Sequence, residues 1–218
     1  MRTKSSMAVL AAAVLSIPVG ATAAAADGDS TIVALTVGGP QDDTLIGHPY
    51  RDKILGRGGD DTIAGRGGRD TLVGGSDNDT VRGQGGADVV RGKQGTDVLT
   101  GGNRSDRING GLGSDTAYGS NGKDVILGGR GPDVINGGTG NDRAADGDGR
   151  DLLRLGRGDD RVAAGQPDRL TDRLNCGPGN NDVVTYVGGF DRNDKLVQCE
   201  LVAVFVNGSM RTMPAPQS

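Results

Sequence analysis

The sequence of 218 residues contains no tryptophan, two phenylalanines and three tyrosines, whereas 41 of its residues are glycine. Aromatic and branched aliphatic side chains form most of the core of an ordinary globular domain. A chain of this length with so few of them is a poor candidate for a conventional enzyme fold. The single histidine, His48, also excludes a metal centre built from several histidines.

Glutamate is almost absent as well. Of the 28 acidic residues, only Glu200 is a glutamate and all others are aspartates. An acidic surface that served only solubility would use both residues. The preference for the shorter side chain indicates carboxylates held close to the backbone, as in turns and cation sites.

The first 26 residues are typical of a secretory signal peptide. Two basic residues precede an apolar run at 7–19, and a tract of small residues follows at 21–26. We expect cleavage after Ala23 or after Ala26, and therefore a secreted, extracellular protein. A transmembrane anchor is disfavoured, because the apolar run is shorter than the roughly 20 residues that span a bilayer. No later segment is apolar enough to span a membrane.

Removal of this segment leaves 22 basic and 28 acidic side chains, and therefore a net charge of −6. The negative charge and the lack of a basic face with interspersed aromatic residues argue against a nucleic-acid partner. The two cysteines, Cys176 and Cys199, both lie in the remaining chain. An even number of cysteines in a secreted protein predicts a disulfide bond.

Aspartate recurs every nine residues through the middle of the chain. The series runs without a gap through Asp43, Asp52, Asp61, Asp70, Asp79, Asp88, Asp97, Asp106, Asp115, Asp124, Asp133, Asp142, Asp151 and Asp160. The residue two positions after each aspartate is always apolar, and the residue five positions before it is glycine except at Asp146 and Leu155. Each unit therefore reads as a glycine-rich turn that ends in aspartate, followed by a three-residue strand with one inward apolar side chain.

So short a strand buries nothing by itself, so successive units must stack. Two units per coil predict an all-β fold: a flattened solenoid of seven coils with two parallel sheets. Aspartates 18 residues apart would then lie about 5 Å apart in adjacent coils and repel one another. A hard divalent cation between the coils would remove this repulsion. Calcium, which accepts six to eight oxygen ligands in a flexible geometry, fits better than magnesium.

The units resemble a known family of repeats. The segments GGLGSDTAY (110–118), GGRGPDVIN (128–136) and GGTGNDRAA (137–145) are similar to the nonapeptide G-G-x-G-x-D-x-U-x of RTX, or haemolysin-type, calcium-binding repeats. This resemblance covers residues 38–163. It implies a parallel β-roll in which several calcium ions lie between neighbouring turns, and a chain that folds when it binds them.

The resemblance also implies the calcium ligands. We expect them to be Asp61, Asp70, Asp79, Asp88, Asp97, Asp106, Asp115, Asp124, Asp133, Asp142, Asp151 and Asp160. The segments 38–43 and 47–52 lack turn glycines, so weak or empty sites are expected there. Asp77 and Arg104 replace a turn glycine and put their flanking sites in partial doubt. Asp146, Asp148 and Asp151 suggest an EF-hand-like loop, but its bidentate glutamate is missing and a degenerate turn is the preferred interpretation.

The two ends of the repeat region are expected to be caps. Residues 27–37 would supply an N-terminal capping strand, and residues 164–209 a C-terminal cap pinned by Cys176–Cys199, with strands at 183–187 and 201–206. The segment 176–200 resembles the terminal stretch of many actinobacterial proteins with these repeats. Residues 210–218 are expected to form a loose tail.

Motifs of catalysis are missing from the sequence. It contains no HExxH, no G-x-S-x-G, no G-x-G-x-x-G and no P-loop. Paired acids such as Asp42 and Asp43 could suggest a glycosidase, but one ligand plus one surface acid is the simpler reading. We therefore expect a non-catalytic calcium-binding protein with no cofactor except calcium. A calcium-dependent module that adheres to cell-surface or matrix components is the first alternative, ahead of an unrecognised enzyme or a disordered linker. Ice binding is disfavoured, because the third position of the units forms no polar ladder.

Overall fold

The computed structural model describes residues 34–164, 170–187, 193–206 and 209–215. The expected signal peptide and residues 27–33 of the expected capping strand lie outside this part of the chain. The described residues form strands and turns without any helix, so none of them belongs to a helix that could cross a membrane.

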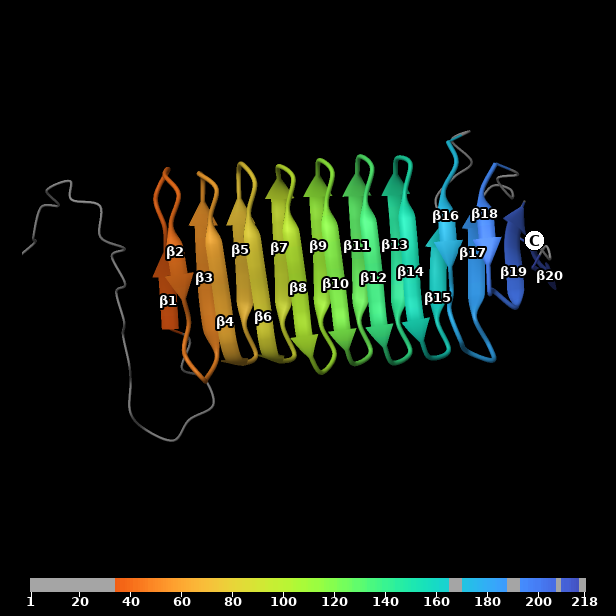
Figure 1. The fold of residues 1–218 in the computed structure, drawn as a ribbon, viewed down its shortest axis with the longest axis horizontal. Helices are drawn as coiled ribbons and strands as arrows, with labels where there is room; N and C mark the ends of the chain where they lie inside the picture. Colours follow the sequence, from red (N-terminus) through yellow and green to blue (C-terminus); the bar gives the residue numbers. More distant parts are fainter. Residues whose placement is uncertain (1–33, 165–169, 188–192, 207–208, 216–218) are drawn as a thin grey trace, which may run out of the picture.

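The strands form two sheets that face each other (Figure 1). Across the first sheet the order is β1 (Ala34–Val37), β3 (Asp52–Arg57), β5 (Thr71–Gly75), β7 (Val89–Gln94), β9 (Arg107–Leu112), β11 (Val125–Arg130), β13 (Arg143–Asp148), β15 (Arg161–Ala164), β17 (Val183–Val187), β19 (Leu201–Val206) and β20 (Ser209–Pro214). Across the second it is β2 (Thr44–Ile46), β4 (Thr62–Gly68), β6 (Thr80–Gly86), β8 (Val98–Asn103), β10 (Thr116–Asn121), β12 (Val134–Thr139), β14 (Leu152–Arg157), β16 (Arg173–Asn175) and β18 (Lys195–Val197).

Consecutive strands alternate between the sheets, and neighbours within a sheet are parallel. Thr116 of β10, for example, pairs with Val98 of β8 and with Val134 of β12, each 18 residues away. Two nonapeptides therefore make one coil, and the expected all-β parallel β-roll is confirmed. Most strands are six residues long rather than three, because they continue through the glycines of the following turn.

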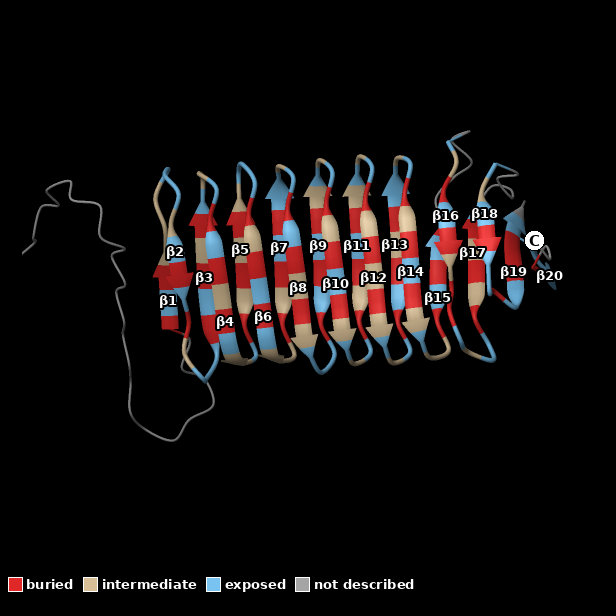
Figure 2. Ribbon diagram, in the orientation of Figure 1, coloured by how far each residue is buried: buried red, intermediate tan, exposed pale blue. Residues whose placement is uncertain are grey.

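Burial alternates along every strand of the repeats (Figure 2). The inward positions are the aspartate, the apolar residue two positions later and the glycine two positions after that. In the unit that begins at Asp124, these residues are Asp124, Ile126 and Gly128, and all three are buried. The core is therefore one apolar column per sheet, flanked by columns of glycine and aspartate.

The solenoid is longer than the sequence indicates. Strands at 183–187 and 201–206 were expected as a cap, but β16 to β19 continue both sheets in parallel, so the coils number nine rather than seven. The nine-residue period hides these coils because their spacing is longer. Asp172 lies 21 residues after Asp151, and Asp182 lies 22 residues after Asp160, yet each occupies the aspartate position of its coil.

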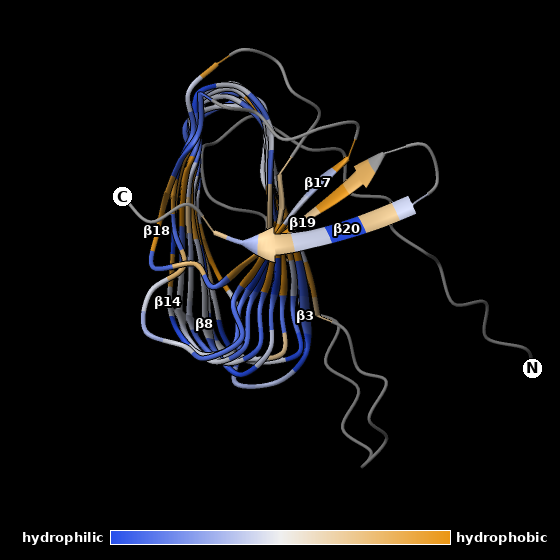
Figure 3. Ribbon diagram, turned by 90° about the vertical axis from the view of Figure 1, so that its right-hand side faces the viewer, coloured by the Kyte–Doolittle hydropathy of each residue, from blue (hydrophilic) through white to orange (hydrophobic). Residues whose placement is uncertain are grey.

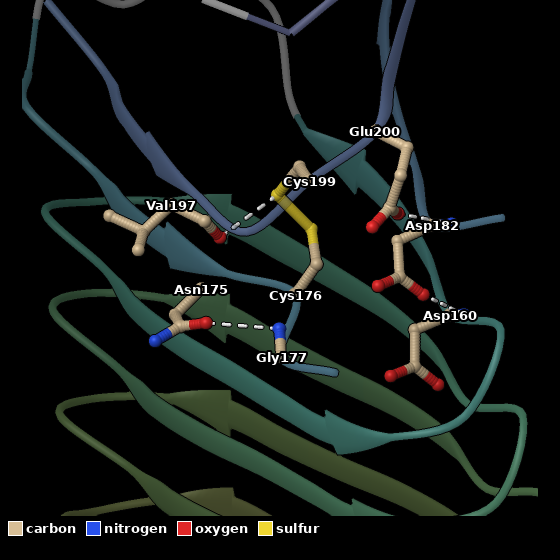
Figure 4. The surroundings of a disulfide bond; sticks show 8 residues. All are labelled: Asp160, Asn175, Cys176, Gly177, Asp182, Val197, Cys199 and Glu200. Atoms are coloured by element: carbon tan, nitrogen blue, oxygen red, sulfur yellow. Dashed lines mark hydrogen bonds between the residues drawn. A yellow bond between two sulfur atoms is a disulfide. The ribbon is translucent and has the colours of Figure 1, made fainter. Parts of the chain in front are cut away.

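A disulfide bond between Cys176 and Cys199 joins the last two coils, as expected (Figure 4). Cys176 follows β16 and Cys199 follows β18, and these strands are neighbours in the second sheet. Both cysteines are buried. The bond therefore ties together coils whose connecting loops are longer than those of the repeats.

The C-terminal segment also differs from expectation. Residues 210–214 were expected to be loose, but they belong to β20, which pairs antiparallel with β19 from Leu201–Pro214 to Val206–Ser209. Seen along the solenoid axis, the hairpin β19–β20 extends beyond the outline of the stacked coils (Figure 3). The strand forms because it satisfies the backbone groups along the outer edge of β19, which would otherwise be unpaired. Residues 216–218 lie outside the described part of the chain.

Candidate metal centre

The aspartates of the repeats form two ladders, one along each edge of the solenoid. The backbone N–H of one aspartate donates a hydrogen bond to Oδ1 of the aspartate one coil further along the chain. The bond from Asp70 to Asp88, for example, is 2.8 Å long. The twelve aspartates expected as ligands all accept this bond, at 2.7–2.9 Å. Their side chains lie between adjacent coils with at most 2% of their surface exposed. The ladders therefore bring together the predicted residues in two rows.

The second carboxylate oxygen of most of these residues has no hydrogen-bond donor among the described residues. Oδ2 is buried and accepts no hydrogen bond from the described residues in Asp61, Asp70, Asp79, Asp88, Asp97, Asp106, Asp115, Asp124, Asp133, Asp142, Asp160 and Asp182. Leaving a charged oxygen buried without a partner is costly, and such groups in proteins are paired or bind metal ions. The ladders thus present a row of oxygens that need a proton or a cation.

Backbone carbonyls converge on the same places. A methyl group built on Gly83 would lie 2.5 Å from Oδ2 of Asp88 and 2.5 Å from the carbonyl oxygen of Gly101, in the next coil. The same distances separate a methyl on Gly119 from Asp124 Oδ2 and the carbonyl oxygen of Gly137. The absent side chain of glycine therefore leaves room beside a carboxylate and a carbonyl oxygen. Oxygen donors of these two kinds are the ones that calcium prefers.

Burial raises the pKa of the ladder carboxyls. Loss of hydration is the largest cause, the backbone hydrogen bond to Oδ1 opposes it, and neighbouring carboxylates in the ladder raise several of the values further. The pKa rises to about 7 for Asp70, Asp79, Asp106 and Asp133. It rises to about 6 for Asp97, Asp142, Asp160 and Asp182. Near neutral pH these carboxyls are therefore close to their pKa. A bound cation would stabilise the ionised carboxylate.

The first two units differ from the other twelve. The N–H of Gly39 donates to Oδ2 of Asp43, and the N–H of His48 donates to Oδ2 of Asp52, both at 2.6 Å. His48 Nδ1 also lies 3.1 Å from Oδ1 of Asp52. The chain itself therefore occupies these carboxylates. This geometry supports the prediction of weak or empty sites at 38–43 and 47–52.

Backbone conformation explains the division. In every unit from Asp61 to Asp160, the residues four and two positions before the aspartate have positive φ, whereas those of the first two units do not. Asp77 and Arg104, which replace glycine two positions before an aspartate, both adopt φ of 76° and keep the turn. Asp79 and Asp106, the aspartates that follow them, keep Oδ2 without a donor. The sequence put the sites beside Asp77 and Arg104 in partial doubt, but the geometry of these two turns matches that of the glycine turns.

The second-to-last repeat, which contains Asp151, brings an additional carboxylate into the ladder. Asp146 occupies a position that is glycine in most other units, and carboxylate oxygens of Asp146, Asp151 and Asp172 lie within 4.8 Å of one another. All three residues are buried. Asp148 of the suspected EF-hand-like loop is instead exposed, 3.6 Å from Arg130. The cluster therefore joins two coils rather than forming a single loop.

The ladders also extend to residues that were not predicted. Asp182 receives the N–H of Asp160 at 2.6 Å and donates its own N–H to Glu200 Oε2 at 2.8 Å (Figure 4). The single glutamate thus ends one ladder, and Asp172 extends the other. The sequence does contain a local pattern that could have identified these residues. An acid is followed two positions later by an apolar residue, as in Asp182 and Val184, although this pair lies outside the nine-residue period.

A family model of the RTX calcium-binding nonapeptide repeat matches the chain in four copies, at residues 37–72, 65–99, 100–135 and 136–166. These copies cover more than half of the chain and include all twelve predicted ligands. No curated protein matches the chain. The match to the repeat family, together with the stacked coils, the aspartate ladders and their partnerless oxygens, shows that the chain belongs to the family of RTX calcium-binding nonapeptide repeat proteins.

Proposed function

We propose that the protein is a secreted, non-catalytic calcium-binding protein whose β-roll folds when calcium binds between its coils. The observation that carries this proposal is the row of buried Oδ2 atoms without a donor. An ion-free fold must keep these oxygens protonated or accept their repulsion, and a core of one apolar column per sheet offers little to offset that cost.

The ligands in this proposal are the twelve aspartates from Asp61 to Asp160, helped by carbonyl oxygens of the glycine turns. Bound calcium supplies positive charge between adjacent carboxylates. Because the unfolded chain has no preformed cage, the free energy of calcium binding becomes free energy of folding. Secretion is supported by the composition of residues 1–26 alone, and an oxidising, calcium-rich compartment agrees with the disulfide bond.

The surroundings of the single histidine support a non-catalytic role. His48 contacts Asp52 through its ring and stacks on Tyr50, with 4.9 Å between the ring centroids. It lies in the second unit, where the chain itself occupies the carboxylate. These contacts are those of a residue that fills a turn.

The first experiment is a far-UV circular dichroism titration of the chain from residue 27, with calcium and then with magnesium. We expect a coil-like spectrum that becomes β-rich with calcium alone, and isothermal titration calorimetry should report several ions per chain. Asp70→Asn should lower that number, whereas Asp52→Asn, its neighbour in the same ladder, should not. The proposal would be contradicted if calcium changed neither the circular dichroism spectrum nor the heat of titration.

A second candidate is a calcium-dependent adhesion module for cell-surface or matrix components. One observation favours it: the outward positions of both sheets carry basic side chains, such as Arg107 and Arg154, and among the described strands Asp148 at the end of β13 is the one exposed acidic residue. Calcium-dependent retention of the protein on cells, lost in the presence of a chelator, would be the result that this role requires.

A further inference from the structure

Acidic and basic side chains occupy opposite parts of the structure. Sixteen aspartates are buried, and only eight described acidic residues are not. All twenty described lysines and arginines are exposed. The negative net charge of the sequence therefore comes from the interior, and the exterior is basic.

Bound calcium would make the surface of the protein strongly positive. Ions between the coils would neutralise the buried carboxylates, so the outer shell would act with twenty positive and eight negative side chains, an excess of twelve positive charges. Without calcium, the sixteen buried aspartates, when ionised, would outweigh this excess and give the described residues a net charge of −4, from twenty positive and twenty-four negative side chains. The sign of the potential at the surface thus depends on the proposed calcium binding, on which the present inference rests.

One part of the basic exterior is hollow. A groove with a volume of about 600 Å³ runs across several coils beside the first sheet, and Asp124 and Asp142 of the ladder contribute to its lining. Arg143 and Arg161 line one side from β13 and β15, where they are paired in register. Lys123 also lines the groove, from the turn that precedes β11. The groove therefore has three exposed cations above carboxylates that are proposed to bind calcium.

The remaining polar groups of the groove suit a ligand with hydroxyl groups. Asn141 and Asn181 line it with amides, which donate and accept hydrogen bonds. Asp159 is its one acidic side chain outside the ladder, and it accepts hydrogen bonds from Asn181 Nδ2 at 3.3 Å and from the Asn180 N–H at 3.4 Å. Arg143 and Arg161 form no ion pair with any residue that the structure describes, so both are available to an anion from outside.

We propose that the calcium-loaded protein binds an extended acidic polysaccharide along this groove, with Lys123, Arg143 and Arg161 contacting its carboxylate or sulfate groups. Guanidinium groups bind such oxyanions through two parallel hydrogen bonds. Arg143 and Arg161 lie in adjacent coils, and the groove follows the solenoid axis across several coils, so a linear polymer can lie along it. The asparagines would contact the sugar hydroxyls.

A nucleic acid fits this groove less well. Binding of single strands relies on aromatic side chains that stack on the bases. Among the residues that the structure describes, no aromatic one lines the groove. The exposed Tyr118 lies on β10, in the other sheet.

The test measures binding of heparin, which is sulfated, and hyaluronate, which carries carboxylates alone, by isothermal titration calorimetry at fixed ionic strength. Neutral dextran and single-stranded DNA serve as comparisons. We expect binding of at least one acidic polysaccharide in calcium and its loss in a chelator. Arg143→Gln/Arg161→Gln should weaken binding about tenfold, since each exposed charge pair contributes up to about 1 kcal/mol. The matched control is Arg82→Gln/Arg154→Gln, which removes the same charge from the outer face of the second sheet and should change affinity by less than about twofold.

The outcomes separate the inference from the proposed function. If circular dichroism shows no response to calcium, the proposed function fails. If the protein folds with calcium but binds neither polysaccharide, only the inference fails. Equal losses in the two double variants would show attraction by overall charge and overturn the groove. Tighter binding of DNA than of either polysaccharide would overturn the choice of ligand.

Discussion

The backbone N–H of Asp70 donates a hydrogen bond of 2.8 Å to Oδ1 of Asp88, one coil further along the chain. The same carboxylate keeps its other oxygen buried without a donor. One aspartate therefore has two roles, since Oδ1 helps to set the register between coils and Oδ2 is available to a cation. Substitutions can separate these roles.

Asp88→Asn should weaken calcium binding while it preserves the fold. The amide oxygen can still accept the N–H of Asp70, but the negative charge is lost. We expect the apparent calcium affinity to fall at least about tenfold and the binding to become less cooperative. Asp88→Ala should remove both roles and also lower stability. Calcium titrations followed by circular dichroism measure both effects.

Asp42 offers the control for Asp88. It is exposed, and among the described residues it accepts only the backbone N–H of Asp60, at 2.8 Å. Asp42→Asn should leave calcium affinity unchanged, and Asp42→Ala should be nearly silent. Equal effects at Asp42 and Asp88 would show that the assignment of ligand and surface acid is wrong.

Gly119→Ala should damage a calcium site without removing any ligand. The added methyl group would lie 2.5 Å from both Asp124 Oδ2 and the carbonyl oxygen of Gly137, where the neighbours are backbone and a short side chain. We expect a loss of about 1–3 kcal/mol in the free energy of unfolding and at least one ion fewer in calcium titrations. Gly58→Ala is the control, because its nearest neighbours would be 3.8 Å away and its φ is not positive. A silent Gly119→Ala would contradict the cradle between coils.

The ion-free protein should be most stable in acid. Burial raises the pKa of Asp70 and Asp106 to about 7, above the value of 3.8 for an exposed aspartate. A raised pKa in the folded state stabilises the fold below the unfolded value, and this stability is lost as the pH rises towards 7. In a chelator, β-structure should therefore be present near pH 4 and disappear between about pH 4 and 7. With calcium the dependence should reverse, because protons compete for the ligands. Circular dichroism against pH in both conditions is the measurement, and a chelated protein that gains structure as the pH rises would refute the argument.

Reduction of the Cys176–Cys199 bond should lower stability without removing calcium sites. The bond closes a loop of 23 residues, for which chain entropy predicts about 3 kcal/mol. Chemical unfolding in calcium should show this loss for the Cys176→Ala/Cys199→Ala variant. The number of ions should stay constant, since both cysteines lie beyond the twelve expected ligands. A variant that binds fewer ions would mean that the last coils contribute to the sites.

Much of the fold was determined by the sequence itself. A strict period of nine residues, with aspartate, an apolar residue and glycine in constant positions, has one efficient solution. Each unit is too short to bury its apolar side chain alone, so it must stack on its neighbours in register. The two sheets, the register of 18 residues and the two aspartate ladders follow from this requirement, and so does the prediction of a cation between the coils.

Other features of the protein depend on the tertiary structure and cannot be read from the nine-residue period. Asp172 and Asp182 join the ladders across longer loops, because register depends on pairing between strands and not on spacing in the chain. The first two turns differ from the other twelve because a backbone N–H of the turn donates to Oδ2 of the aspartate. The N–H of His48, for example, donates to Oδ2 of Asp52. The sequence has a net charge of −4, and its basic exterior becomes visible only when burial separates the acidic interior from the surface.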